Sequence, residues 1–383
     1  MSNDLDDAGT TAADEPRDRV LPRLGGLGLQ RVGGLLAAVV IAGFIFAVWS
    51  DWLFLKTGNL VVMIRLMGVL GIIGLGLLVV LLVGEIDLSF SALAVLSAIV
   101  MGKMWVELGY HIAVGFLVAF AVAIGVGLFN AFFVNVVKVP SFIVTLGSNT
   151  LVFGFTLLIS RNTPILAQKL PPDPEEWQVR GGDYVDAAEY TFFRALASNY
   201  ALPGRFPLQV VWLAGFAIVF GILLSRGVFG FRMKAIGGNE QAAVLAKLPV
   251  RRYKTLAFVI CACMAAVGGL LDFSFISQVQ PNQGGVYLFP VFTAVIVGGA
   301  SLSGGRGTVS GTLLGALLLA VISNGLALNA TGAFVQQMWL GTVTIGAVVL
   351  DQWTRSRQPS ESLGAGLREL GSRLGLGRTS DER

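Results

Sequence analysis

The chain contains 383 residues, of which 55% are hydrophobic and only 13% are charged, whereas about a quarter of the residues in a soluble domain are charged. This balance, together with a mean hydropathy of +0.76, excludes a soluble globular fold and is typical of a polytopic membrane protein. The formal net charge of +4 is not gathered in a basic stripe with interleaved aromatic residues, so the composition does not indicate a nucleic-acid partner.

Residues 1–32 precede the first long apolar stretch. They begin with acidic residues, continue with arginines and glycines, and lack the basic start and small-residue cleavage site of a secretory signal. We therefore expect a disordered cytoplasmic tail, followed by a first span that the protein retains.

Ten stretches approach or exceed the roughly 20 apolar residues that a helix needs to cross a bilayer. In chain order these are 33–49, 59–83, 88–105, 112–136, 141–160, 207–225, 255–275, 286–302, 308–328 and 334–350. Only helices and closed barrels satisfy backbone polar groups in lipid. We therefore predict an all-α, polytopic transmembrane domain over residues 33–352, with a basic cytoplasmic tail at 353–383.

The distribution of basic residues predicts the orientation of these spans. If the N-terminus is cytoplasmic, ten spans place 226–254 and 353–383 inside and 161–206 outside. The inside segment 226–254 contains seven Lys or Arg residues in 29 positions, whereas 161–206 contains five in 46. This difference agrees with the positive-inside rule, so we predict that both termini are cytoplasmic.

The first candidate functional motif is VGEIDLS, Val83 to Ser89, where two carboxylates interrupt apolar sequence. Carboxylates at bilayer depth are costly and usually functional, but Glu85 and Asp87 fall at the junction of two expected spans. At such a junction Asp87 or Ser89 can cap the next helix, and capping is the role that we expect for Asp87.

Several uncharged hydrogen-bonding side chains lie inside otherwise apolar spans. Such residues either join neighbouring helices or line a path for a hydroxyl-rich solute, and the sequence leaves both roles open. They are Asn130, Thr145, Ser148, Asn149, Ser323 and Asn324.

The external segment 161–206 contains the sequence DYVDAAEYTFFRALASN, Asp183 to Asn199. We expect a helix here, with Tyr190, Phe192 and Phe193 near the membrane interface. The segment either rests as a lid on the outer ends of the spans or contacts an external partner protein.

Residues 229–247, FGFRMKAIGGNEQAAVLAK, form a basic, Ala-rich segment between two apolar stretches. Two glycines break one helix, Asn239 is suited to cap a second, Glu240 in its first turn favours the helix dipole, and Pro249 ends the run. A loop that only sets orientation needs charges but no apolar ridge, so the Ala-rich face predicts a partner with a groove. The residues expected to form this contact are Arg232, Lys234, Gly237, Gly238, Asn239, Glu240, Ala242 and Ala243, with Arg251, Arg252 and Lys254 as further flanking charges. The alternative is a solvated basic loop.

A second glycine-rich motif, GGASLSGGRG at Gly298 to Gly307, weakly repeats the pattern of VGEIDLS. Both motifs place a polar turn between two apolar spans, as expected of broken helices near a transport path. After it, glycines at 307, 311 and 315 leave one face of the ninth span without side chains, which predicts close approach of another helix.

The chain lacks the sequence motifs of the common catalytic sites. It has no GxxxxGK[ST] phosphate loop, no nucleophile elbow and no HExxH, so we expect neither nucleotide hydrolysis nor another enzymatic activity, and no cofactor. The single His111 and the apolar Cys261 and Cys263 cannot assemble a metal site, so no metal is expected.

Four motifs in this order resemble the permease subunits of bacterial ABC importers for monosaccharides, the ribose, arabinose, galactose and xylose group. They are EIDLS at 85–89, VPSFIVTLGS at 139–148, F-G-x-R-x-x-A-I-G-G-N-x-x-A-A at 229–243 and GGASLSGGRG at 298–307. The resemblance implies a type II importer-like permease in the bacterial inner membrane. It further implies a permease homodimer, an ABC ATPase that binds the coupling loop 226–254, and a periplasmic sugar-binding protein.

Two residues depart from the family pattern. Glu85 stands where many members have glycine and resembles the xylose-type permeases, and Lys247 replaces a usual glycine after the coupling helix. The leading hypothesis is a monosaccharide permease. The alternatives are a permease for another small solute, such as a branched-chain amino acid or a cyclitol, an ion-coupled secondary carrier, and a membrane scaffold without a path.

Overall fold

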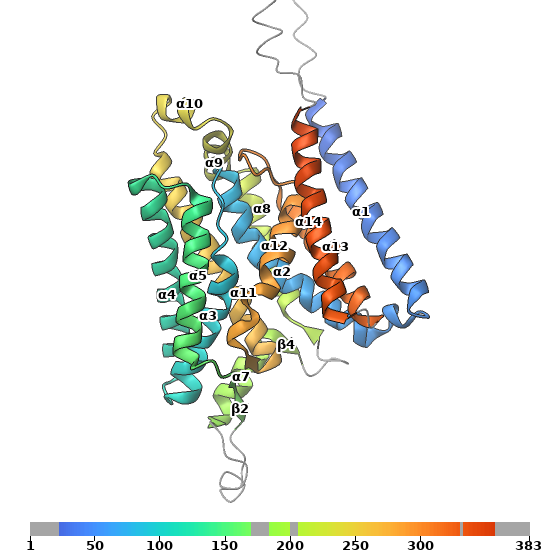
Figure 1. Ribbon diagram of the computed structural model, residues 1–383, viewed down its shortest axis with the longest axis vertical. Coiled ribbons are helices and arrows are strands. Elements are labelled where there is room, and N and C mark those ends of the chain that lie inside the picture. The colour runs from blue at the N-terminus through green and yellow to red at the C-terminus, as the bar shows by residue number, and fades with distance from the viewer. Residues whose placement is uncertain (1–22, 170–183, 200–205, 330–331, 357–383) are drawn as a thin grey trace, which may run out of the picture.

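The computed structural model describes residues 23–169, 184–199, 206–329 and 332–356 as a bundle of helices that run along one direction (Figure 1). The helices are α1 (Arg23–Trp49), α2 (Thr57–Leu82), α3 (Phe90–Gly102), α4 (Ile112–Phe132), α5 (Ser141–Ser160), α7 (Ala187–Ala197), α8 (Gln209–Ser225), α9 (Val228–Gly238), α10 (Glu240–Leu245), α11 (Val250–Ile276), α12 (Gly284–Val297), α13 (Val309–Leu328) and α14 (Gly332–Ser356). Each of the ten predicted spans overlaps one of these helices.

The number of helices that cross a membrane by length alone is smaller than ten. In the described part of the chain, seven helices are long and apolar enough, or eight when α8 and α9, which meet at a bend of 67°, count as one span. Helix α12 has only 14 residues and contains Pro290, so at about 1.5 Å per residue it is shorter than the hydrocarbon layer. The polytopic helical fold is therefore confirmed, with α12 as a short helix where a full span was expected.

Helices α2, α3 and α11 form the centre of the bundle. Helix α2 is buried on all sides from Gly68 to Leu82, and α3 is buried along its entire length. Glycines on α2 allow this, since a Cβ at Gly76 would lie 2.7 Å from the Cβ of Met264 and 3.0 Å from the Cα of Cys261 on α11. Close backbone approach is the usual means of holding helices together in lipid.

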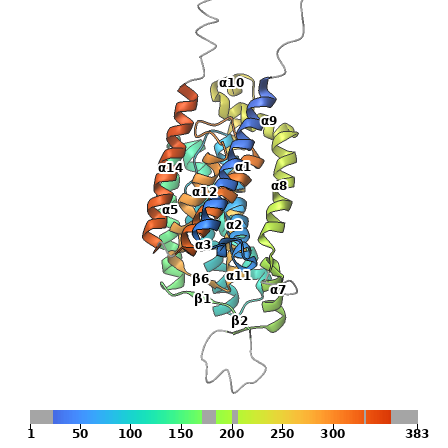
Figure 2. The same ribbon diagram turned by 90° about the vertical axis from the view of Figure 1, so that its right-hand side faces the viewer.

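The two ends of the bundle differ in structure (Figures 1 and 2). Helices α9 and α10 lie at one end, together with the start of α1 and the end of α14; we call this the α10 end. Helix α7 and the short strands lie at the opposite end, the α7 end. The strands form three two-stranded sheets: β1 (Ile165–Leu166) with β6 (Gln278–Val279), β2 (Gln168–Lys169) with β3 (Tyr184–Val185), and β4 (Ser198–Asn199) with β5 (Phe206–Pro207).

The first helix begins earlier than the sequence predicted. Helix α1 starts at Arg23, so residues 23–32 are helical, whereas a disordered tail was expected there. Residues 1–22 lie outside the described part. Helix α14 extends to Ser356, four residues beyond the predicted end of the transmembrane domain. Nearly all of the remaining C-terminal tail is outside the described residues.

The glycines of the ninth predicted span form the expected close contact. On α13, a Cβ at Gly311 would lie 1.9 Å from the carbonyl oxygen of Gly298, and a Cβ at Gly315 would lie 1.9 Å from that of Ala294. Both oxygens belong to the end of α12. Gly307 lies before α13 and contacts Leu78 of α2 instead, so the predicted glycine face consists of Gly311 and Gly315.

We expect Gly315→Ala to separate α12 from α13, because the added methyl group has no space beside the carbonyl of Ala294. Overpacking of this kind costs about 1–3 kcal/mol. The melting temperature of the purified protein in detergent should fall. Gly154→Ala on α5 is the matched control, since nothing lies within 4 Å of a Cβ at Gly154; equal melting temperatures for the two variants would contradict this packing.

Candidate coupling site

The short helix α10 forms at the sequence that predicted it. Gly238 ends α9, and the side chain of Asn239 then accepts a hydrogen bond from the backbone N–H of Ala242 at 2.9 Å. This bond satisfies one of the free donors in the first turn of α10. The helix ends at Leu245, before Pro249, which the sequence predicted as the end of the run.

The two faces of α10 have different environments. Ala243 is only 4% exposed and packs into the hydrophobic core of its own chain, so it cannot contribute to an outward ridge as expected. Consecutive residues of a helix point about 100° apart, so Ala243 can face the core while its neighbour Ala242 stays exposed. Leu245 is 84% exposed and Val244 is 56% exposed. The outward face of α10, which we define as Ala242, Val244 and Leu245, is therefore apolar and uncovered in this chain.

Three glycine-containing turns meet directly beneath α10. A Cβ at Gly237 would lie 2.0 Å from the carbonyl oxygen of Leu82, and a Cβ at Gly304 would lie 2.7 Å from the Cα of Gly84. The N–H of Gly305 also donates to the carbonyl of Leu82 at 3.1 Å. The motifs at 83–89 and 298–307, which are far apart in sequence, thus support the end of α9 backbone against backbone.

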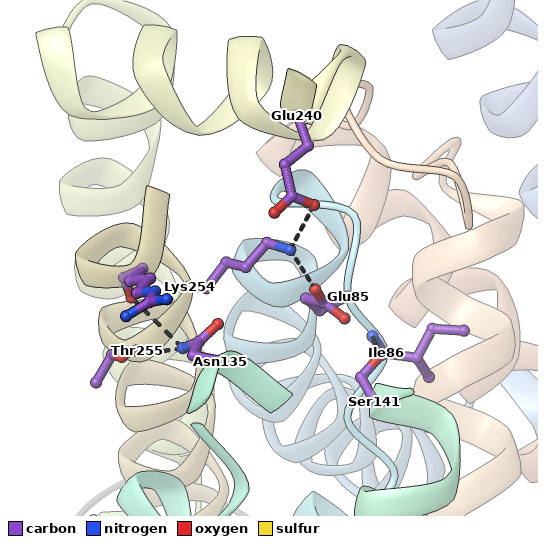
Figure 3. Close-up of polar contacts among 8 residues, drawn as sticks. Glu85, Ile86, Asn135, Ser141, Glu240, Lys254 and Thr255 are labelled. Atoms are coloured by element: carbon purple, nitrogen blue, oxygen red, sulfur yellow. Dashed lines mark hydrogen bonds and ion pairs between the residues drawn. The ribbon is translucent and has the colours of Figure 1, made fainter. Parts of the chain in front are cut away.

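An ion-pair cluster joins α10 to the segment between α2 and α3 (Figure 3). The ammonium of Lys254, in the first turns of α11, donates to Glu85 Oε1 at 2.6 Å and to Glu240 Oε2 at 2.8 Å. From the sequence, Lys254 was expected only as a flanking charge, and no partner was predicted for Glu85. Residues 83–89, here named the 83–89 break, are therefore connected to the first residue of α10.

The 83–89 break is also bound to α5 (Figure 3). The N–H of Ile86 donates to Ser141 Oγ at 3.1 Å, and Thr145 Oγ1 donates to the carbonyl of Ile86 at 3.2 Å. The break therefore bonds to α5, whose first residues belong to the motif VPSFIVTLGS at 139–148.

Asp87 does not cap α3 as predicted. Its Oδ1 accepts hydrogen bonds from the backbone N–H of Ser89 at 2.8 Å and from Ser89 Oγ at 2.6 Å. In the first turn of α3 it is Asn149 Oδ1 that accepts from a backbone N–H, that of Ala92, at 3.3 Å. Asp87 stands two residues before Ser89, so its side chain closes a local turn instead of reaching into the helix. Asn130 Nδ2 donates to Ser89 Oγ at 2.8 Å, which ties this turn to α4.

The six candidate path residues separate into groups that the structure does not bring together. Asn130, Thr145 and Asn149 surround the 83–89 break and the start of α3, where Asn149 Oδ1 accepts from Ser91 Oγ at 2.9 Å. Asn324 instead forms a reciprocal pair with Asn59, at 2.8 and 3.0 Å, with Ser323 beside it on α13. These bonds join helices, which is the role the geometry supports.

Ser148 has a different environment from the other candidate path residues. It lies with apolar side chains in a groove of about 380 Å³ between α3, α4 and α5. Ser148 is the only polar side chain among the residues that line this groove.

The two basic residues predicted for the coupling contact form bonds within their own chain. Arg232 Nη1 donates to the hydroxyl of Tyr253 at 3.1 Å, and Lys234 Nζ donates to the carbonyl of Leu224 at 3.0 Å. Both therefore brace α9 against its neighbours α8 and α11.

Comparison with known proteins identifies the family of the chain. Residues 59–350 match the family described as branched-chain amino acid transport system / permease component. The chain belongs to this family of permeases.

The most similar curated relatives of the permease include three sugar permeases. A ribose import permease of Bacillus subtilis is 29% identical over 85% of this chain and 93% of its own length. A fructose import permease of Rhizobium meliloti is 29% identical over 84% of this chain and 85% of its own length. A xylose transport system permease of Escherichia coli is 28% identical over 84% and 92%. No solved structure matches the chain.

At the α7 end, the segment 184–199 of the permease forms a cap on the helix ends. The ring of Phe193, which is fully buried, packs between Trp105 at 4.9 Å and Phe273 at 5.0 Å. Trp105 Nε1 donates to Glu189 Oε2 at 2.6 Å. These contacts support the lid that the sequence offered as one alternative, and Phe192, at 54% exposure, faces outward.

Two acidic residues of this segment have roles inside the chain. Asp186 caps α7 by accepting from the backbone N–H groups of Ala188 and Glu189, and Glu189 holds Trp105. Asp183 lies outside the described residues. Both carboxylates therefore bond within the chain, although the side chain of Asp186 remains exposed at the surface.

Lys247 adopts a left-handed backbone conformation, with φ of 59°. This conformation closes the end of α10, because the N–H of Lys247 bonds to the carbonyl of Val244 and that of Leu248 to the carbonyl of Ala243. Glycine adopts it without the steric cost of a Cβ atom. The structure thus shows that lysine closes the end of α10 in a conformation that glycine would adopt at lower cost.

We expect Lys247→Gly to stabilise the end of α10, because the left-handed conformation costs a residue with a Cβ about 1–2 kcal/mol. Hydrogen exchange of the α10 amides should become slower by a factor of about 5 or more. Lys247→Ala, which removes the charge but keeps the Cβ, should exchange like the wild type. Faster exchange in the glycine variant would show that the conformation carries no strain.

Proposed function

We propose that the chain is the membrane-spanning subunit of an ABC importer that carries a monosaccharide, a pentose or a hexose, across the bacterial inner membrane. The family match over residues 59–350 establishes a transport permease. The observation that carries the proposal is the sugar specificity named for its relatives, which the chain matches over more than four fifths of its length.

The energy for transport is proposed to come from a separate ATPase subunit. The sequence contains no phosphate loop, so this chain has no group to cradle the phosphates of ATP. We propose that it is not itself an enzyme and that the ATPase binds the outward face of α10. An uncovered apolar side chain such as Leu245 beside the solvated end of a membrane protein is suited to a groove in a partner.

The α10 end is proposed to face the cytoplasm. Exposed basic residues gather at this end, which favours the cytoplasmic side: Lys138, Arg226, Lys247, Arg251 and Arg252. At the α7 end the exposed basic residues of the described chain are fewer: Lys56, Arg161 and Lys169. The two termini then lie in the cytoplasm, and the cap formed by α7 lies in the periplasm.

Two further partners complete the proposed assembly. We propose that the permease works as a homodimer, with one ATPase for each copy, and that a periplasmic sugar-binding protein docks at the α7 end. The exposed ring of Phe192 beside the buried Phe193 supports docking there, since exposed aromatic residues anchor many protein interfaces.

Substitution Ala242→Asp tests the proposed ATPase contact. In a groove the new carboxylate would be buried without a partner, at a cost of about 3 kcal/mol or roughly a hundredfold in affinity. We expect normal membrane insertion but loss of ATPase co-purification and of sugar uptake. Leu245→Asp should have the same effect, because Leu245 belongs to the same face and is 84% exposed.

The control for this test is Ala242→Ser, which keeps the size of the side chain and adds no charge. It should co-purify with the ATPase like the wild type. Ala243→Asp is not a suitable variant, since Ala243 is buried in the permease itself. Wild-type uptake and co-purification in Ala242→Asp and Leu245→Asp would show that α10 is a solvated loop.

The substrate class is tested in proteoliposomes that contain the permease, its ATPase and its binding protein. We expect uptake of a labelled pentose or hexose that depends on ATP. No uptake of leucine or of inositol is expected above the level without ATP. Uptake of leucine alone would assign the chain to the branched-chain amino acid permeases that the family description names.

A further inference from the structure

Lys254 connects three segments that are far apart in sequence. It lies near the start of α11, Glu240 is the first residue of α10, and Glu85 lies in the 83–89 break (Figure 3). A lysine ammonium has three donors on a flexible stem, so it can hold two carboxylates together. Since one positive charge faces two negative charges, each carboxylate depends on the same ammonium for its partner.

The two ion pairs of Lys254 differ in exposure. The side chains of Lys254 and Glu85 are 9% and 12% exposed, whereas that of Glu240 is 48% exposed. The pair with Glu85 is therefore shielded from solvent, and the pair with Glu240 lies at the surface beside α10. A partner that moves α10 changes the exposed pair first, while the shielded pair remains in place because an isolated buried carboxylate is costly.

The contacts beyond Lys254 lead into the core of the bundle. Glu85 precedes Ile86, whose backbone is bound on both sides by α5, through Ser141 and Thr145. At the start of α11, Asn135 Nδ2 donates to the hydroxyl of Thr255 at 3.1 Å (Figure 3). The neighbourhood of Lys254 is thus attached to α5 and to the residues that directly follow α4. Helices α4 and α5 both pack against α3, the helix that follows the break.

We infer that Lys254 is the positioning residue through which a displacement of α10 reaches the 83–89 break and the helices around it. The inference rests on the proposed function, because it requires that the ATPase acts on α10. Lys254 touches neither solute nor nucleotide in this role. It holds the carboxylates of Glu85 and Glu240 close to each other. The end of α2, the start of α3 and α10 therefore change position together.

Lys254→Met removes the ammonium and retains a side chain of similar length. In the full transporter reconstituted in liposomes with its ATPase and binding protein, we expect sugar molecules imported per ATP hydrolysed to fall by about tenfold, the usual size of a coupling between two sites. Lys254→Arg should restore most of this ratio. A role in stability alone would lower the amount of transporter and leave the ratio unchanged.

Glu240→Gln is the second variant, since it removes only the exposed pair and leaves Lys254 bound to Glu85. It should also lower the ratio, and it should have no further effect when Lys254 is already Met. If Lys254→Met does not reach the membrane, Glu240→Gln alone decides the test. A wild-type ratio in Lys254→Met or in Glu240→Gln would overturn the inference.

Lys138→Met is the matched control, because Lys138 is an exposed basic residue at the same end of the bundle but in neither α10 nor α11. It should have the wild-type ratio. If neither the wild type nor this control binds the ATPase, the proposed function itself fails. If both transport sugar normally and Lys254→Met does so too, only the role of Lys254 is contradicted.

Discussion

The structure of the α10 end depends on direct backbone contact between three turns. Gly237 leaves no room for a side chain against the carbonyl of Leu82, and Gly304 packs on Gly84 in the same way. The end of α9, which leads directly into α10, therefore rests on the end of α2 and on the turn between α12 and α13 without any flexible side chain between them. A rigid seat of this kind transmits a displacement, whereas a layer of long side chains would absorb it.

Electrostatics adds a second connection to this seat. Lys254 bridges Glu240 of α10 and Glu85 of the 83–89 break, and the break is held in turn by Ser141 of α5. A glycine at position 85 would keep the backbone contacts of the turns but would remove the ion pair with Lys254. Glu85 is thus a departure from the family pattern that has a partner in this chain, and the pair explains why a carboxylate is tolerated among apolar helices.

The sequence predicted the elements whose signals are local. Apolar length located a helix in each of the ten predicted spans. Asn239 after two glycines predicted α10, and the repeated glycines at 311 and 315 predicted the contact of α13 with α12. It did not predict the direction of side chains on α10, because six residues are too few for a reliable periodicity, and Ala243 faces the core. The sequence also did not predict the partner of Glu85, because Lys254 lies 169 residues away. Only the packing of α11 against α2 brings the two residues together.

We propose that the outward face of α10 meets the ATPase while Lys254 joins α10 to the 83–89 break. Electron cryomicroscopy of the assembled transporter, without nucleotide and with a non-hydrolysable ATP analogue, tests it most directly. We expect Leu245 inside a groove of the ATPase in both states, with Lys254 bound to Glu85 while α10 and the break shift together. Leu245 in solvent, or a shift of α10 that leaves the break in place, would contradict the account.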